Sequence, residues 1–255
     1  MSHIRREDSC LVSISSRHAT IRDSGAFTMN MGNTTFAEKT KAIIPISATI
    51  TNIFPNIKSD YTITVPFGGG VVAKGQYTLA ELAAAFETAI SLVDVTVNVT
   101  SDKKIQVLNS SGDSATIEIP EPLALQIGFG TGSSTSYTMA LNPAASETAS
   151  HLPNLSGEQV VHIECDRLGH ANMVHGRDGK LNDVIVTIPL HDTPYGFTKT
   201  VTTGDVNSYS IQYREPTSMS STMQFRILDS EMEILEYPPN HHFEMIMKIH
   251  HDEHR

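Results

Sequence analysis

Two stretches near the end of the chain decide its fold, MQFRI at residues 223–227 and FEMIMKI at residues 243–249. Apolar side chains occupy every second position of both. Successive side chains of a β-strand point to opposite faces, so this period predicts two strands that each bury one face. VHIEC at residues 161–165 repeats the pattern and places His162 and Cys165 on opposite faces of a third strand.

Further short strands with the same alternation are spread along the chain. They are expected at residues 43–54, 61–65, 95–99, 105–107, 117–119, 184–188, 209–213 and 234–235. In the first of these strands, Ile44, Ile46, Ala48 and Ile50 are expected to form one buried face. Many short strands separated by turns are typical of a β-sandwich or barrel.

One helix is predicted after Thr78. Thr78 is a favourable N-cap, and Glu81 three residues later completes a capping box. An apolar stripe follows at helical spacing and ends at Val93. A short helical turn is expected at residues 121–125, and residues 131–156 are interpreted as a linker or long loop because Ser, Thr, Ala and Asn dominate them.

These elements predict an all-β fold, a single jelly-roll β-sandwich with a small inserted α+β module. Residues 1–40 are interpreted as an N-terminal arm that orders against a partner, and residues 41–57 as the first jelly-roll strand. Residues 58–150 form the inserted β-α-β-β-β module and linker, and residues 151–255 the remainder of the jelly roll. Two sequential domains are the competing arrangement.

Composition narrows the classes of function. The net charge is −10 and no Lys/Arg cluster stands out, so nucleic acid is not expected as a direct partner. Two cysteines cannot make a disulfide framework, which fits a reducing compartment. No apolar run approaches the roughly 20 residues of a membrane-spanning helix, and no secretory signal is visible at the N-terminus.

Several motifs resemble a family of viral proteins. They are YTITVP at residues 61–66, GQYTLAEL at 75–82, LQIGF at 125–129, VHIECDRL at 161–168, PYGF at 194–197 and ILDS at 227–230. Their order is similar to that in single-jelly-roll penton and minor capsid proteins of the double-jelly-roll lineage of double-stranded DNA viruses, which includes nucleocytoplasmic large DNA viruses, virophages and polinton-like elements. The resemblance covers about residues 43–250.

The resemblance implies a structural protein of the virion, and no enzyme. The expected role is the penton, a homopentamer at the five-fold vertices of an icosahedral capsid among trimers of a major capsid protein, assembled in the host cytoplasm or nucleus. Other minor capsid proteins are further expected partners. A minor cement protein between capsomers is one alternative, and a glycan-binding jelly-roll spike module is the other. Whether a spike or glycan attaches stays open.

Histidine and cysteine offer the one pattern that suggests a metal. The sharpest group is His162, Cys165, His170 and His175, yet the first two are expected on opposite faces of a strand, which prevents tetrahedral convergence. The C-terminal histidines are interpreted as a solvated strand end or a pH-sensitive contact. These are His241, His242, His250, His251 and His254, beside Asp252 and Glu253. We therefore assign no metal.

No other motif predicts catalysis or a cofactor. GFGTG at residues 128–132 and GGG at residues 68–70 lack the helix and the Lys-Ser/Thr pair of a phosphate loop, so they are interpreted as turns. No catalytic or cofactor-binding residue is assigned. For a glycan site, the candidate aromatic residues are Tyr137, Tyr195 and Tyr237.

Overall fold

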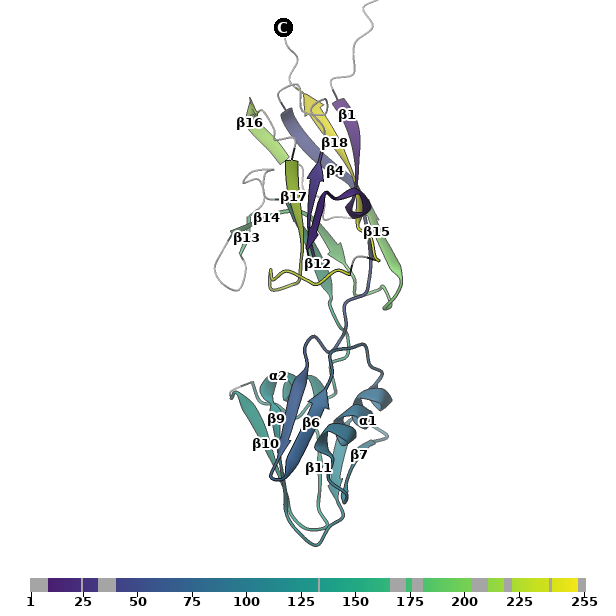
Figure 1. The fold of residues 1–255 in the computed structure, drawn as a ribbon, viewed down its shortest axis with the longest axis vertical. Helices are drawn as coiled ribbons and strands as arrows, with labels where there is room; N and C mark the ends of the chain where they lie inside the picture. Colours follow the sequence, from purple (N-terminus) through teal and green to yellow (C-terminus); the bar gives the residue numbers. More distant parts are fainter. Residues whose placement is uncertain are drawn as a thin grey trace, which may run out of the picture. The chain divides into compact units, whose positions relative to one another are not determined.

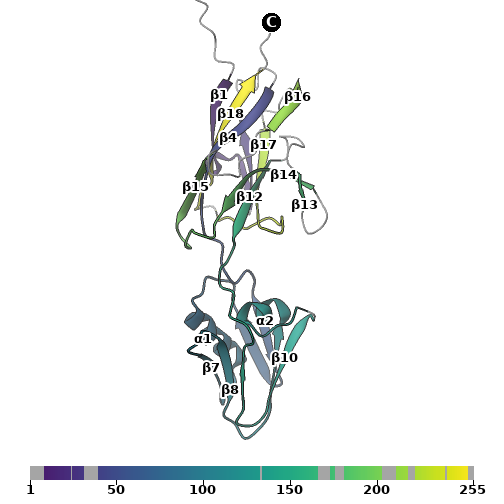
Figure 2. The same cartoon turned by 180° about the vertical axis from the view of Figure 1, so that it is seen from behind.

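The computed structural model of the chain describes residues 9–23, 25–31, 40–132, 134–165, 173–175, 181–202, 211–217, 222–238 and 240–251. The chain divides into two compact units. One combines Met1–Ile53 with Glu158–Arg255, and the other is Phe54–Gly157. The second unit therefore interrupts the first in sequence (Figures 1 and 2).

The first unit consists of two antiparallel sheets. The first sheet has the order β1-β18-β4-β15, with β16 also paired to β4; the second has the order β13-β14-β12-β17-β3-β2. The strands are β1 (Ser9–Ser15), β2 (Ile21–Asp23), β3 (Ala26–Asn30), β4 (Thr40–Thr51), β12 (Val160–Cys165), β13 (Met173–His175), β14 (Leu181–Pro189), β15 (Thr198–Thr202), β16 (Ile211–Thr217), β17 (Thr222–Leu228) and β18 (Glu244–His251). A short 3₁₀ turn, Ser16–His18, follows β1.

The pairing of these strands is that of a jelly roll. The first strand pairs with the last (β1 with β18). Leaving aside the three-residue β2, the next strand inward from each end is β3 or β17, and these two also pair. Continuing inward, β4 pairs with β15 and β12 with β14. This nested order is what results when one long antiparallel hairpin is wrapped into two facing sheets, and it gives the two Greek keys of the jelly-roll class.

The core of this unit is formed by the inward faces of both sheets. Phe27 of β3 stacks on Phe225 of β17 with ring centroids 5.4 Å apart, and Phe243 lies 5.6 Å from Phe27. All three rings are buried. The expected face of Val161, Ile163 and Cys165 is buried as well, because period-two alternation places these side chains between the sheets.

Residues 9–30 do not form the arm expected from the sequence. They contain β1, β2 and β3, and Ile14, Phe27 and Met29 are part of the core. The insertion consequently follows the third principal strand, β4, and not the first strand as expected. The sequence pattern is weak here because each strand carries only a few inward apolar residues, and the pairing partners β18 and β17 lie about 190 to 240 residues further along the chain.

The buried face of β4 also differs from the prediction. Ile43, Pro45, Ala48 and Ile50 point inward, whereas Ile44 and Ile46 do not. The cause is a β-bulge: neighbouring Met247 and Ile246 of β18 pair with Pro45 and Ser47, which leaves Ile46 as an extra residue. A proline at this bulge is expected, since proline cannot donate to a regular central ladder.

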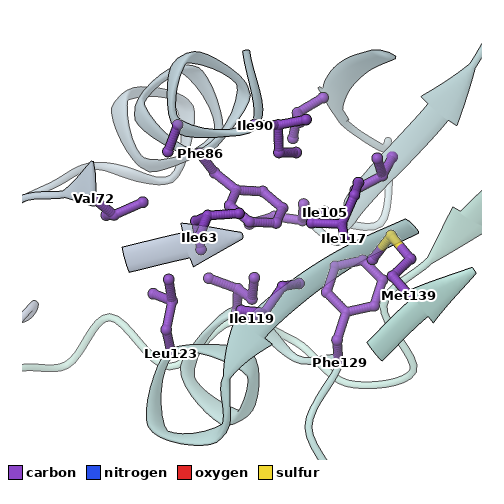
Figure 3. Packing of buried hydrophobic residues seen from close by; sticks show 14 of the residues in the cluster. Ile63, Val72, Phe86, Ile90, Ile105, Ile117, Ile119, Leu123, Phe129 and Met139 are labelled. Atoms are coloured by element: carbon purple, nitrogen blue, oxygen red, sulfur yellow. The ribbon is translucent and has the colours of Figure 1, made fainter. Parts of the chain in front are cut away.

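The second unit packs two small sheets and two helices around its own core. Its elements are β5 (Tyr61–Val65), β6 (Gly68–Val72), α1 (Leu79–Ile90), β7 (Val95–Val99), β8 (Ile105–Asn109), β9 (Ala115–Pro120), α2 (Glu121–Ile127), β10 (Ser136–Leu141) and β11 (Ser146–Thr148). The sheet orders are β10-β9-β5-β6 and β11-β8-β7. Figure 3 shows Phe86 of α1 reaching toward Ile63, Ile105 and Ile117.

The end of helix α1 and the segment at residues 131–156 differ from the prediction. The helix begins at the expected capping box of Thr78 and Glu81 but ends at Ile90, because Ser91 adopts a left-handed conformation with φ 53°. Val93 is consequently 98% exposed and does not belong to the helical stripe. The segment interpreted as a linker contains β10 and β11, and Met139 and Leu141 of β10 are buried.

Candidate interaction surfaces

The outer face of the first jelly-roll sheet carries an apolar patch, formed by Leu11, Ile44, Ile46 and Ile246. Strand register brings these residues together. Leu11 and Ile44 both lie opposite Lys248 of β18, and Ile246 lies two residues away on the same face of that strand. Leu11 is 71% and Ile246 39% exposed. An outward face of an antiparallel sheet is ordinarily polar, so this patch departs from the usual alternation.

The surroundings of the apolar patch carry little charge. Among the side chains described on this face of β1, β18, β4 and β15, only Glu244 and Lys248 are carboxylate or ammonium groups, and their charges cancel. Hydroxyl groups occupy the remainder toward β15. Thr49 contacts Thr200 with 3.0 Å between the hydroxyl oxygens, and Thr51 contacts Thr198 at 3.4 Å. This near neutrality contrasts with the net charge of −10 on the chain.

The outer face of the second sheet is polar and internally paired. Arg226 Nη1 donates to Glu164 Oε2 at 3.0 Å, joining β17 to β12. His162 Nδ1 lies 2.9 Å from the Thr187 hydroxyl of β14. Burial lowers the pKa of His162, and the nearby carboxylates of Glu158 and Asp229 offset part of this effect.

The sequence candidates for a metal site are not brought together within the described structure. Cys165 is fully buried, whereas His162 is half-buried on the other side of β12 and bonded to Thr187. His170 lies outside the described residues, and so does the side chain of His175 in β13. No group of three or more potential metal ligands occurs among the residues that the structure describes.

The C-terminal histidines separate into two places. His241 and His242 belong to the loop before β18, which Arg22 of β2 holds by donating to the carbonyls of Pro238 (2.8 Å) and His241. Burial and the positive charges of Arg17 and Arg22 lower the pKa of His242. In β18, His251 Nε2 lies 3.4 Å from the thiol of Cys10.

His250, also in β18, pairs in register with Ser9 of β1. His254, Asp252 and Glu253 lie outside the described residues.

Only one of the three aromatic candidates for glycan binding is well exposed. Tyr237 is buried, and its hydroxyl donates to the carbonyl of His242 at 3.1 Å. Tyr137 is half-buried and donates to Glu147; burial and the neighbouring carboxylates raise its pKa to about 12. Tyr195 is 46% exposed and is joined by Phe197, 64% exposed, which the sequence pattern did not identify.

Tyr195 and Phe197 are displayed by a rigid turn between β14 and β15. Phe197 N–H donates to the Pro194 carbonyl at 3.1 Å, and Gly196 has φ 84°, as the third position of a type II turn requires. Asn52 fastens the turn: its carbonyl accepts from Gly196 (2.6 Å), its N–H donates to Phe197 (2.8 Å) and its side-chain amide donates to Thr193 (2.6 Å).

Of the two glycine-rich stretches interpreted as turns, the first is not one. Gly68, Gly69 and Gly70 open strand β6 and pair with Val65, Thr64 and Ile63 of β5, while the turn itself is formed by the two residues before them. Gly128 ends α2 with φ 92°, and the following backbone N–H groups of Thr131 and Gly132 donate to the carboxylate of Glu121. The loop at residues 128–132 therefore binds a carboxylate of the protein itself through two backbone N–H groups.

In the described part of the chain, no helix has the length and apolar character needed to cross a bilayer.

Comparison with known proteins gave structural neighbours only. No family model and no curated protein matches the sequence. Among solved structures, the mavirus penton protein is 10% identical, with a TM-score of 0.49, and the match covers 96% of this chain and 99% of that one. A chain of the Sputnik virophage, from a cryo-EM structure, is 9% identical with a TM-score of 0.48, covering 96% and 98% of the two chains.

Proposed function

We propose that the chain is a non-enzymatic structural component of a viral capsid, and that it forms a homopentamer at five-fold vertices among trimers of a major capsid protein. The observation that carries the proposal is a jelly roll whose first sheet carries an apolar patch on an outer face that is nearly uncharged over the side chains described in β1, β18, β4 and β15. Such a face favours protein association, because little charge must be desolvated when it is covered. The sequence resemblance to penton proteins supports the same role.

A closed ring also needs two different patches on each subunit. Cyclic symmetry beyond a dimer joins one surface of a subunit to another surface of the next. The two sheets of the jelly roll present outer faces of different chemistry, one apolar and one polar with an internal ion pair. The two unlike outer faces provide the two different surfaces that head-to-tail closure requires.

The mass of the purified protein in solution tests this proposal. Native mass spectrometry at several concentrations is expected to show a pentamer. A protein that stays monomeric alone, and that binds purified major capsid trimers along their sides without forming pentamers, contradicts the vertex role and supports the cement alternative. Measuring metal content on the same sample checks the expectation of no stoichiometric metal.

Glycan attachment is the second candidate, and the exposed rings of Tyr195 and Phe197 favour it. Aromatic rings on a fixed turn can stack on the apolar face of a sugar. Two charged side chains beside the turn are paired with each other: Lys199 Nζ donates to both carboxylate oxygens of Asp192, at 2.8 and 2.7 Å. A glycan array with the Phe197→Ala variant as control tests it: binding that the variant loses supports a glycan-binding role.

A further inference from the structure

The apolar patch combines features of a surface that another protein covers. Leu11, Ile44, Ile46 and Ile246 come from three neighbouring strands, so the patch is contiguous across the sheet and does not consist of single scattered residues. The bulge at Pro45 contributes to it directly, because it leaves Ile46 outside the regular alternation of β4. The aliphatic stem of Lys248 lies between Leu11 and Ile44 in the strand register and extends the apolar surface.

Charge restricts what can cover the patch. Each copy of the chain carries a net charge of −10, so two copies repel one another unless they meet through surfaces that are nearly free of charge. The outer face of the first sheet is such a surface, since Glu244 and Lys248 are its only described carboxylate and ammonium groups. A nucleic acid or an anionic bilayer would instead require a basic face.

We propose that the apolar patch is the contact surface through which one copy of this chain binds a second copy. The inference rests on the proposed function for the order of the assembly, but the identity of the surface is independent of whether the assembly is a pentamer. In a ring, the patch of one copy covers a different surface of the next; in a dimer it would pair with itself.

The test is a charge introduced into the patch. We expect Leu11→Lys to raise the dissociation constant of the assembly by roughly 100-fold, because a lysine there must be desolvated without a partner on binding. Leu11 is 71% exposed, so this change leaves the folded monomer intact. Ile246→Lys is expected to act in the same direction.

Leu152→Lys is the matched control. Leu152 is 62% exposed, but it belongs to the second unit and therefore to neither sheet of the jelly roll. It receives the same charge and should leave the dissociation constant within about threefold of the original. The thermal midpoint of each variant, measured below the association range, verifies that folding is unchanged.

The possible outcomes separate this inference from the proposed function. A pentamer that Leu11→Lys and Ile246→Lys leave intact overturns the inference and keeps the penton role. A dimer or another order that both variants dissociate supports the inference and contradicts the penton role. A chain that is monomeric at all concentrations, or a Leu152→Lys variant that dissociates equally, overturns the inference.

Discussion

His162 is a single residue through which the folding stability of the jelly roll depends on pH. Its imidazole lies on the outer face of the second sheet, bonded to the Thr187 hydroxyl and half-buried. Burial disfavours the protonated form and lowers the pKa of His162, although Glu158 and Asp229 partly compensate. The unfolded chain, where the pKa is ordinary, therefore takes up a proton more readily than the folded protein does.

We expect this difference to reduce stability in mild acid. As the pH falls through the ordinary histidine pKa of about 6.5, protonation of the unfolded state lowers the free energy of unfolding, and the loss levels off below the depressed pKa of the folded state. Asparagine at this position cannot titrate, so His162→Asn should show a smaller decrease between pH 7.5 and 5.5 in urea denaturation. His18→Asn, at an exposed position, is the control; equal decreases in all three proteins would contradict the expectation.

The capping box of α1 is the element for which local sequence and structure agree most closely. Thr78 N–H and hydroxyl donate to Glu81 Oε2, both at 2.8 Å, and Glu81 N–H donates back to Thr78 Oγ1 at 3.3 Å. These bonds lower the pKa of Glu81. All the contacts lie within four consecutive residues, which explains why the helix start could be read from the sequence, whereas its end depended on the conformation of Ser91.

Removing the cap should destabilise the second unit. Thr78→Ala is expected to lower its free energy of unfolding by about 1 kcal/mol, because the Glu81 N–H loses the Thr78 hydroxyl oxygen that accepts its hydrogen bond. Thr88→Ala is the matched control, since Thr88 lies within the same helix and alanine has the higher helix propensity. Thermal unfolding followed by circular dichroism checks both variants; a Thr88→Ala change that costs as much as Thr78→Ala would contradict a capping role.

For the whole molecule, the two-unit organisation changes what the N-terminal segment is expected to do. β1 and β3 provide the partners of β18 and β17 and contribute Ile14, Phe27 and Met29 to the core. The second unit has a core of its own, formed entirely by residues between Ile57 and Ala149. The first unit depends on strands from both ends of the sequence, whereas the second is continuous.

Two deletions test this dependence. Deleting residues 1–40 removes β1 and β3, and because truncating one large core side chain costs about 3–5 kcal/mol, the first unit should lose its cooperative unfolding transition. Deleting residues 1–8 removes no described strand and should retain it. Limited proteolysis with mass spectrometry should recover residues 54–157 as a protected fragment from both. A cooperative jelly roll after the longer deletion would contradict the role of β1 and β3.

Local pattern in the sequence was sufficient for the elements whose information is short-range. Alternation at residues 161–165 and 223–227 predicted strands with the correct buried faces, and the capping box predicted the start of α1. A jelly roll was foreseen from the number of such strands. Hydrophobic period and capping act between neighbouring residues, so they are visible without the fold.

Pairing between distant segments decided the remainder. β1 and β3 carry a weak pattern and exist as strands because β18 and β17 supply their hydrogen bonds. The outward position of Ile46 follows from its register against Met247 and Ile246, which no local pattern encodes. Leu11 and Ile44 become neighbours of Lys248 only when the two ends of the chain pair. The apolar patch is therefore a product of long-range β-pairing, since strand register depends on which segments meet.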